Sequence, residues 1–245
     1  MTGFPKPQKF SSRLASIEKV SSNVYLERFE LVEPKEITFL PGQTVMLCVA
    51  PGINRSMSIA SLPDEKNAIL LVHDVGPMGP YSKWTLGAKV GDPMTFMGPL
   101  GIFVMDKESP CRKVFVATGT GIAPFYSMVK DYFAHGGTRE VTLYWGLRHE
   151  EDIFWQKEFE ELARQYPNFK FVLTLSQPIE PQQGSPPPAG GWRSGHVQEH
   201  IFSGQQNFSD ADYYLCGSKA MTDEMREKLK SAGVPEAQVK FELFY

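Results

Sequence analysis

The stretch Lys113-Val-Phe-Val-Ala-Thr-Gly-Thr-Gly-Ile-Ala-Pro124 decides the fold of the second half of this 245-residue chain. Its first six residues form an apolar run typical of a buried strand, and the glycines after it permit a tight turn into a helix. The unpaired N–H groups at the start of such a helix favour a bound anion. Pro124 fits the first helical turn, where it removes no hydrogen bond. The stretch predicts a phosphate-binding strand–turn–helix unit, with a tight turn that holds no ligand as the alternative.

The residues after this stretch alternate between strand-like and helix-like patterns. Helices are predicted from Gly121 to Ala134, after a cap at Asp152, and after a cap at Ser218. The Pro/Gln/Gly-rich segment 177–191 is predicted as a surface loop. Strands separated by helices of this length predict a doubly wound parallel sheet. The later predicted strands are 141–145, 169–175, 211–216 and 239–244.

The residues before the stretch follow a different pattern, in which short strands are separated by turns rich in Pro and Gly. Runs at 24–32, 44–49 and 68–75 have this form, which predicts an antiparallel β-barrel. Charged residues, Ser and Pro interrupt both patterns between Asp106 and Arg112. We therefore predict a two-domain chain, with an antiparallel β-barrel at 1–108 and an α/β parallel-sheet domain at 109–245.

The composition narrows the class of protein. A hydrophobic fraction of 42% and a charged fraction of 22% are typical of a soluble globular chain. The net charge of −3 argues against nucleic acid or an anionic membrane as a partner. No apolar run is long enough to span a bilayer and the first residues lack a secretory pattern, so we expect a cytoplasmic protein.

The three cysteines, Cys48, Cys111 and Cys216, are isolated from one another in the sequence. Their odd number and wide spacing argue against a disulfide framework, a zinc site and an iron–sulfur cluster. No metal is expected. Any redox chemistry would therefore need an organic cofactor.

With a barrel first and the Thr118–Pro124 turn opening an α/β domain, the chain resembles the ferredoxin–NADP⁺ reductase superfamily over nearly its whole length. The resemblance implies an FAD-binding barrel domain at 1–108 and an NAD(P)-binding domain at 109–245. It implies an electron-transport flavoprotein, a flavin-dependent NAD(P)H oxidoreductase with FAD and NADH or NADPH as cofactors.

Arg55-Ser56-Met57-Ser58 resembles the family's Arg-x-Tyr-Ser flavin motif. The resemblance implies that Arg55 neutralises the flavin diphosphate, that the residue at Met57 lies against the flavin ring, and that Ser58 reaches the ring nitrogen N5. Met57 departs from the family's tyrosine. A thioether still packs on an aromatic ring, but it offers no phenol, so we expect weaker or differently tuned flavin binding.

Two further barrel segments resemble flavin-binding parts of the family. Val72 and His73 match the strand that carries the adenine half, with His73 in place of a basic residue. Gly79, Tyr81 and Ser82 belong to a Gly-rich turn before a short helix, where Ser82 would donate to the diphosphate. An ordinary Gly/Pro turn is the alternative for this second segment.

The second domain supplies the dinucleotide site and the catalytic end. Cys216-Gly217 resembles the family's Cys-Gly motif beside the nicotinamide, so Ser58, Cys216 and Glu242 are the expected catalytic residues. A terminal aromatic, Phe244 or Tyr245, would cover the flavin. The expected dinucleotide-binding residues are Thr118, Gly119, Thr120, Gly121, Pro124, Gly146, Arg148, Ser176, Gln177, Cys216 and Gly217.

The choice between NADH and NADPH depends on the ends of the second and third parallel strands. Gln177 is neither the basic residue usual beside Ser176 in NADPH users nor the acid of many NADH users. Arg148, where the chain leaves the second of these strands, and Arg193 are the basic candidates for a 2′-phosphate, although surface arginines are common. The sequence therefore leaves both NADH and NADPH as alternatives and slightly favours NADH.

The expected partner is a ferredoxin, a flavodoxin or an oxygenase component that exchanges single electrons with the flavin. Two alternatives remain: a free-flavin reductase, which the substitution at Met57 favours, and a non-catalytic electron-transfer subunit of a larger complex. Cys216 and Glu242 argue against the second alternative.

Overall fold

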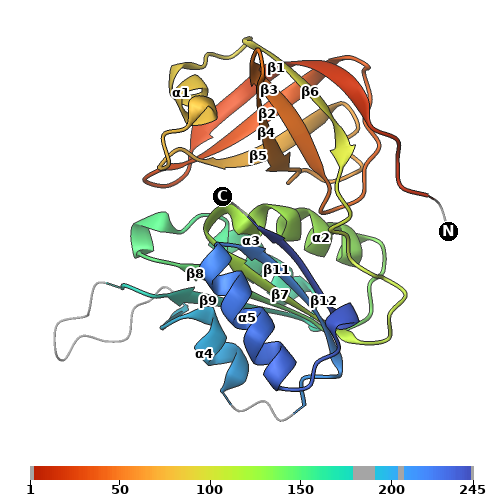
Figure 1. Cartoon of the computed structure of the whole chain (residues 1–245), viewed down its shortest axis with the longest axis vertical. Helices are drawn as coiled ribbons and strands as arrows, with labels where there is room; N and C mark the ends of the chain where they lie inside the picture. The colour runs from red at the N-terminus through yellow and green to blue at the C-terminus, as the bar shows by residue number, and fades with distance from the viewer. Residues whose placement is uncertain (1–2, 179–190, 204–206, 244–245) are drawn as a thin grey trace. The chain divides into compact units, whose positions relative to one another are not determined.

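The computed structural model describes residues 3–178, 191–203 and 207–243 (Figure 1). Contacts divide the chain into two compact units. The first contains Met1–Asp106 and Ala123–His135, and the second contains Lys107–Ile122 and Gly136–Tyr245. The sheets confirm the predicted fold class, an antiparallel barrel-type sheet followed by a parallel α/β sheet. The domain boundary between residues 108 and 109 stays a prediction.

The first unit contains a six-stranded antiparallel sheet in the order β4-β3-β6-β1-β2-β5. The two edge strands, β4 and β5, contact each other, so the sheet curls back on itself. Large apolar side chains fill the interior, where the rings of Phe10 and Phe96 stack 5.0 Å apart. The elements of this unit are β1 (Gln8–Lys19), β2 (Val24–Glu33), β3 (Thr44–Ala50), β4 (Ile53–Ser58), β5 (Ala68–Asp74), α1 (Pro80–Gly87), β6 (Pro93–Leu100) and α2 (Ala123–Ala134).

Helix α2 belongs to the first unit by its contacts, although the sequence alternation places it after the first parallel strand. The hydroxyl of Ser127 donates to the carbonyl oxygen of Ser61 at 2.7 Å. The ring of Phe125 meets that of Phe103 edge-on, with centroids 5.9 Å apart. These contacts join the helix to the segments that follow β4 and β6.

The second unit is built on a six-stranded parallel sheet in the order β10-β9-β8-β7-β11-β12. The central strands β7 and β11 are buried on both faces, as expected for a parallel sheet covered by helices. The elements of this unit are β7 (Arg112–Thr118), η1 (Gly119–Ile122), β8 (Val141–Leu147), η2 (Glu150–Asp152), α3 (Gln156–Gln165), β9 (Phe169–Leu175), β10 (Trp192–Ser194), α4 (Val197–Phe202), β11 (Ala211–Gly217), α5 (Lys219–Ser231), η3 (Glu236–Gln238) and β12 (Val239–Leu243).

Helices α4 and α5 share one face of this sheet, and α3 covers the other. Val197 of α4 and Met225 of α5 belong to one buried cluster. Phe159 of α3 packs instead on Trp145, which is adjacent in β8 to Gly146 and so points to the opposite face. Val197 lies against Gly146. The unit is therefore a three-layer α/β sandwich.

One predicted helix cap is confirmed and one is wrong. The side chain of Ser218 accepts a hydrogen bond from Met221 N and caps α5. Asp152 does not cap α3, because residues 150–152 form their own 3₁₀ turn, in which Asp152 accepts from the N–H of His149. The cap position of α3 is Trp155, which has a left-handed φ of 53° and a buried side chain.

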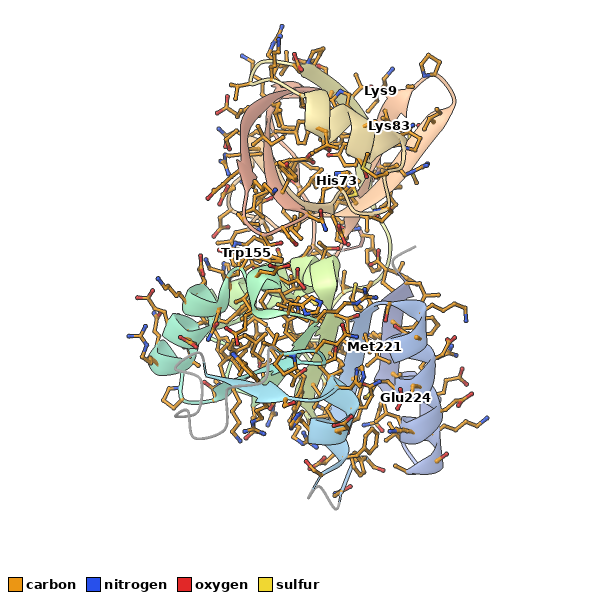
Figure 2. All side chains as sticks on the ribbon, turned by 90° about the vertical axis from the view of Figure 1, so that its left-hand side faces the viewer. Lys9, His73, Lys83, Trp155, Met221 and Glu224 are labelled. Carbon is orange, nitrogen blue, oxygen red and sulfur yellow. The ribbon has the colours of Figure 1, made fainter. Side chains whose placement is uncertain are left out.

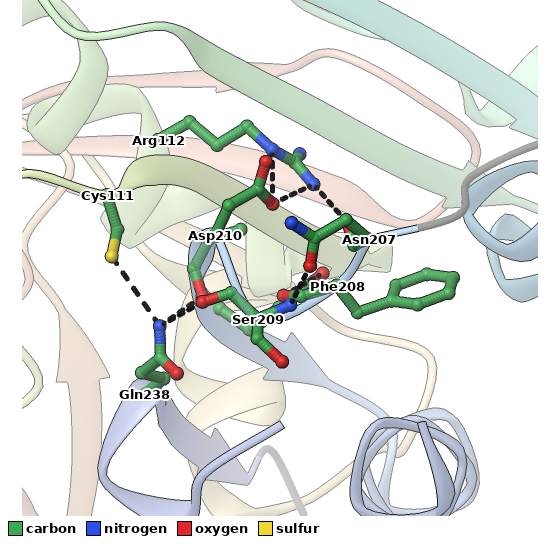
Figure 3. Close-up of polar contacts among 9 residues, drawn as sticks. Cys111, Arg112, Asn207, Phe208, Ser209, Asp210 and Gln238 are labelled. Atoms are coloured by element: carbon green, nitrogen blue, oxygen red, sulfur yellow. Dashed lines mark hydrogen bonds and ion pairs between the residues drawn. The ribbon is translucent and has the colours of Figure 1, made fainter. Parts of the chain in front are cut away.

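Polar contacts fix the segments where β7, β11 and β12 begin (Figure 3). Arg112 pairs with Asp210 at 3.0 Å. The side-chain amide of Gln238 donates to the carbonyl oxygens of Ser209 and Ala211 and to the sulfur of Cys111. These bonds hold the amino ends of three neighbouring strands in register.

Among the described residues, no helix combines the length and the apolar character of a membrane-spanning segment.

Candidate flavin and dinucleotide sites

Strand β4 carries the expected flavin motif along its exposed edge. Arg55 and Ser56 are exposed, and Met57 is half-buried on the same face as Arg55 because alternate residues of a strand share a face. The guanidinium of Arg55 donates to the carbonyl oxygen of Asn54, its chain neighbour, at 2.7 Å. Because Arg55 is exposed, a phosphate could accept from two of its other donors at once.

Ser58 ends this strand with a buried hydroxyl that has no hydrogen-bond partner among the described residues. A buried polar atom normally has a partner, so an orphaned hydroxyl indicates a missing ligand or water. A flavin nitrogen is a suitable partner. The residues of β4 therefore fit the flavin expected there.

The turn before α1 places the second flavin segment. Gly79 is the cap residue of this helix and provides no side-chain cap, so the first N–H groups of α1 keep their capacity to bind an anion. Tyr81 and Ser82 lie in the first turn and are both buried. Val72 and His73 are buried on β5.

The side chains of His73, Tyr81 and Ser82 contact one another inside the first unit, in which Figure 2 labels His73. The imidazole of His73 stacks on the ring of Tyr81 with centroids 4.2 Å apart. The hydroxyl of Ser82 is 3.4 Å from Nε2 of His73. The hydroxyl of Tyr81 donates to Glu27 of β2, a fully buried carboxyl. Burial first, and then the adjacent Glu27, raise the pKa of Tyr81 well above its usual value.

The phosphate turn of the second unit has open space where a ligand would approach. Gly119 has a left-handed φ of 54°, and no atom lies within 4 Å of where a Cβ would stand. Thr120 follows it and is half-buried. The chain continues through Gly121 into α2, of which Pro124 is the second residue. An uncrowded glycine at a strand–helix junction fits the diphosphate of a dinucleotide.

The turns after β7 and β11 interlock through their backbones. A Cβ on Gly121 would lie 2.3 Å from the carbonyl oxygen of Cys216, and one on Gly217 would lie 2.2 Å from Oγ1 of Thr118. The same Thr118 oxygen accepts from the N–H of Ser218 at 2.9 Å. The phosphate turn and the Cys-Gly turn therefore form one rigid edge of the sheet.

Cys216 and Glu242 are direct neighbours in the parallel pairing of β11 and β12. Burial raises the pKa of the Cys216 thiol well above its usual value, and the nearby Glu242 raises it further. Burial also raises the pKa of Glu242 to about 7. Near neutral pH the thiol thus keeps its proton, and the carboxyl is poised between its two forms. Phe244 and Tyr245 lie outside the described residues.

The ends of β8 and β9 bring the expected specificity residues together. The N–H of Ser176 donates to the carbonyl oxygen of Leu147, and that of Gln177 donates to the carbonyl oxygen of Arg148. Nδ1 of His149 lies 2.8 Å from the carbonyl oxygen of Gln177. Arg148 and Gln177 are exposed, and Gly146 precedes them at the end of β8.

Two further residues, which the sequence motifs do not indicate, support these sites. The indole N–H of Trp145 donates to the carbonyl oxygen of Gly119, inside the phosphate turn. Glu27 accepts a hydrogen bond from the Tyr81 hydroxyl and lies 3.8 Å from Nδ1 of His73. Both could have been noticed in the sequence: Trp145 directly precedes Gly146, and Glu27 is an acidic residue within the apolar run of β2. In the part of the chain that the structure describes, no group of acidic, His or Cys side chains is placed to hold a metal.

Two family models match the two halves of the chain. The model described as an oxidoreductase FAD-binding domain matches residues 11–105. The model described as an oxidoreductase NAD-binding domain matches residues 115–227.

Curated proteins and solved structures resemble the whole described chain. Ferredoxin–NADP reductase B of Sorangium cellulosum is 31% identical over 247 residues, which cover 97% of this chain and 98% of that protein. The reductase component of propane 2-monooxygenase from Rhodococcus jostii is 30% identical, and the match covers 97% of this chain but only 64% of that longer protein. The crystal structure of the Amycolatopsis cytochrome P450 reductase GcoB matches with a TM-score of 0.87 and 26% identity, over 99% of this chain and 71% of that one.

Proposed function

Because this chain belongs to the ferredoxin–NADP⁺ reductase superfamily of flavin- and NAD(P)-binding oxidoreductases, we propose that it draws a hydride from a nicotinamide dinucleotide and passes single electrons to a partner protein. FAD and a nicotinamide dinucleotide are its cofactors. The observation that carries the proposal is the Cys216–Glu242 pair beside the interlocked phosphate turn. When bound, the flavin supplies the conversion from two-electron to one-electron transfer.

In the first unit the protein's part is binding and orientation. Arg55 would neutralise the diphosphate of FAD from the exposed face of β4, and the first turn of α1 would offer N–H groups to the same anion. The buried hydroxyl of Ser58 would orient the ring through a hydrogen bond that it lacks within the described chain. Met57 would pack against the ring face.

In the second unit the phosphate turn would hold the dinucleotide so that its nicotinamide lies near Cys216. The buried thiol is protonated near neutral pH, so it would contact the nicotinamide as a small, neutral side chain and not as a nucleophile. Glu242, whose carboxyl is close to evenly divided between its protonated and ionised forms near neutral pH, would in its ionised form offset positive charge on a bound nicotinamide.

The electron acceptor that we propose is a ferredoxin, a flavodoxin or an oxygenase component. Support comes from the relatives, one named as a ferredoxin–NADP reductase and one as the reductase component of a monooxygenase. The propane monooxygenase reductase is longer than this chain, so that comparison supports only the reductase part of its activity.

A second candidate, a free-flavin reductase, is favoured by one observation. Met57 provides a thioether where the family motif has a tyrosine, so the flavin would be held less firmly and could leave after reduction. The two candidates differ in where reduced flavin is found: on the protein for an electron-transfer reductase, and in the buffer for a free-flavin reductase.

An absorption spectrum followed by anaerobic titration tests both candidates. Purified protein is mixed with FAD, passed through a desalting column, and titrated with NADH and then with NADPH. Bleaching of retained flavin, followed by reduction of added ferredoxin, supports the proposed electron-transfer reductase. Bleaching only with excess flavin in solution supports the alternative, and no bleaching with either nucleotide contradicts both.

We further propose NADH as the preferred nucleotide and the cytoplasm as the location. Gln177 carries no positive charge for a 2′-phosphate, although Arg148 is nearby. The three thiols, Cys48, Cys111 and Cys216, are all free, in keeping with a reducing compartment. A lower KM for NADPH than for NADH would contradict the first proposal.

A further inference from the structure

Helix α2 continues directly from the phosphate turn, yet its contacts place it in the first unit. The boundary between the two units falls between Ile122, which ends the turn, and Ala123, which begins the helix. The turn would offer its N–H groups to the dinucleotide, whereas the helix packs on the segments that follow β4 and β6. The way α2 is held in the first unit therefore also limits where the last residues of the phosphate turn can lie.

Ser127 makes a buried polar contact between α2 and the segment after β4. Its hydroxyl donates to the carbonyl oxygen of Ser61 at 2.7 Å, and neither residue is more than 2% exposed. Breaking a hydrogen bond between buried groups costs the desolvation of the group that loses its partner, so this bond holds the helix and the segment together. Ser127 is three residues after Pro124, which places it about one turn from the start of the helix.

Ser61 is itself fixed close to the flavin motif. It is three residues after Ser58, whose orphaned hydroxyl fits a flavin nitrogen. The N–H of Ala60 donates to the carbonyl oxygen of Leu70 at 2.8 Å, and the N–H of Leu70 donates to the hydroxyl of Ser61 at 3.2 Å. A short path of hydrogen-bonded groups therefore joins the flavin motif to α2, and α2 leads directly back to the phosphate turn.

Apolar contacts support the same placement of the helix. The ring of Phe125 meets that of Phe103 edge-on, with centroids 5.9 Å apart. A Cβ on Gly42, which has a left-handed φ of 94°, would collide with Cε of Met128 and with the carbonyl oxygen of Phe103. Apolar attraction has no direction, whereas a hydrogen bond weakens steeply when its geometry changes. We therefore expect the packing to hold α2 against the unit and the Ser127 bond to set its position along that surface.

We propose that Ser127 is a positioning residue for hydride transfer, because its bond to Ser61 fixes the phosphate turn with respect to the flavin motif and so fixes how the nicotinamide meets the flavin. The inference rests on the proposed function. Ser127 is fully buried and cannot contact either cofactor itself. Loss of the bond should therefore slow the reaction and leave the affinity for each cofactor unchanged, since misplacement by about 1 Å can cost about 100-fold in rate.

Ser12 provides a matched comparison for a role in stability alone. Its hydroxyl also donates to a backbone carbonyl oxygen, that of Met94, at 2.9 Å. Ser12 is 2% exposed and lies in the same unit, but its bond joins β1 to β6 and does not involve α2. Removal of either hydroxyl should lower the melting temperature by about 2 to 4 °C, the value of one hydrogen bond in a chain of this size. Only removal of the Ser127 hydroxyl should also change the rate.

The test compares wild-type protein, Ser127→Ala and Ser12→Ala, each loaded with FAD and mixed anaerobically with NADH in a stopped-flow instrument. The dependence on NADH concentration separates the limiting rate of flavin reduction from the dissociation constant of the nucleotide. In Ser127→Ala the limiting rate should fall about tenfold, while the dissociation constants of NADH and FAD stay within about twofold of wild type. Ser12→Ala should retain the wild-type limiting rate.

A second measurement requires no cofactor. Amide hydrogen exchange of flavin-free protein should be faster over residues 123–134 in Ser127→Ala than in the wild type, because the helix has lost its buried hydrogen bond. In Ser12→Ala the exchange of these residues should equal that of the wild type.

A wild-type limiting rate in Ser127→Ala, or a slower rate accompanied by equally weakened binding of FAD or NADH, would overturn the inference. Wild-type protein whose flavin is reduced by neither NADH nor NADPH would instead refute the proposed function. If Ser127→Ala fails to fold, Phe103→Leu decides, because it loosens the apolar contact of the same helix. A slower limiting rate with unchanged dissociation constants in Phe103→Leu supports the inference, and an unchanged rate contradicts it.

Discussion

The indole N–H of Trp145 donates a 2.9 Å hydrogen bond to the carbonyl oxygen of Gly119. Gly119 is in the left-handed region, so this bond fixes the residue with which the phosphate turn begins. The indole itself is fully buried and meets the ring of Phe154 edge-on at 4.9 Å. A side chain of β8 thereby determines how the loop after β7 presents its N–H groups.

Trp145→Phe should weaken dinucleotide binding without affecting the flavin. Loss of the bond leaves the Gly119 carbonyl free to turn, and the KM for the nicotinamide nucleotide should rise about fivefold, the value of one hydrogen bond. The kcat and the FAD content should not change. Steady-state kinetics check this, with Phe159→Leu as a control that loosens the same packing but keeps the indole N–H. A fall in melting temperature with unchanged KM would contradict the positioning role.

Gly121→Ala should disrupt the interlocked turns. The new methyl group would lie 2.3 Å from the carbonyl oxygen of Cys216 and 2.8 Å from Cα of Gly217, both of which are backbone atoms. Because the backbone there is braced by the Thr118–Ser218 bond, we expect loss of nucleotide-dependent flavin reduction and destabilisation by about 3 kcal/mol. Gly136→Ala is the control: it strains a left-handed φ of 79° but meets no atom within 4 Å, so it should cost only about 1 kcal/mol.

Met57→Tyr should tighten flavin binding. A phenol at this position restores a flat ring for stacking and adds a hydrogen-bond donor, so the dissociation constant of FAD should fall about tenfold. Quenching of flavin fluorescence measures the change. Met97→Tyr introduces the same side chain at a surface position of β6 and should have no effect. Unchanged affinity in Met57→Tyr would place the flavin ring elsewhere.

Glu242→Gln should remove a pH dependence of stability. Burial raises the pKa of Glu242 to about 7 in the folded chain, against about 4.3 when unfolded. A carboxyl with a raised folded pKa stabilises the fold fully below the unfolded pKa, and this contribution is lost as the pH rises to about 7. Its size is on the order of 3 kcal/mol. Urea unfolding at pH 5 and pH 8 should show this loss in the wild type and in the control Glu227→Gln, but not in Glu242→Gln.

Lys113 and Asp212 should behave as a coupled buried pair. Nζ of Lys113 lies 2.7 Å from Oδ2 of Asp212, and the lysine side chain is fully buried. Removal of either partner leaves the other as an unpaired buried charge and should lower the free energy of unfolding by about 3 to 5 kcal/mol. The double variant Lys113→Met with Asp212→Leu should be more stable than either single variant in denaturant melts. Simple additivity of the two single changes would show that the pair is not coupled.

The sequence predicted those parts of the fold in which local pattern and tertiary packing agree. The strand 169–175 was predicted to the residue, since its apolar run ends where burial ends. Ser218 caps α5 as expected, because capping depends on residues only three positions apart. The prediction that Asp152 caps α3 is wrong. Its carboxylate accepts a hydrogen bond from the N–H of His149, and α3 begins four residues later, at Gln156.

The sequence predicts the candidate-site residues that lie next to one another in a motif, but not the hydrogen bonds that join residues far apart in the chain. The residues of β4 and of the phosphate turn are adjacent in sequence, so their spacing alone brings them together. The Glu27–Tyr81 bond joins residues 54 positions apart, and the Thr118–Ser218 bond joins residues 100 positions apart. Such contacts depend on strand order and register, which no short motif encodes.

The three free cysteines differ in exposure: Cys48 on β3 is exposed, Cys111 is half-buried, and Cys216 is buried with a raised pKa. A maleimide or iodoacetamide reacts with accessible thiolates, so it should label Cys48 first and spare Cys216 in the native protein. Cys48 is therefore a ready attachment point for a fluorescent or spin label on the folded protein. By the same reasoning, inactivation by a thiol reagent would report chain opening or damage at the other two cysteines before it reported chemistry at Cys216.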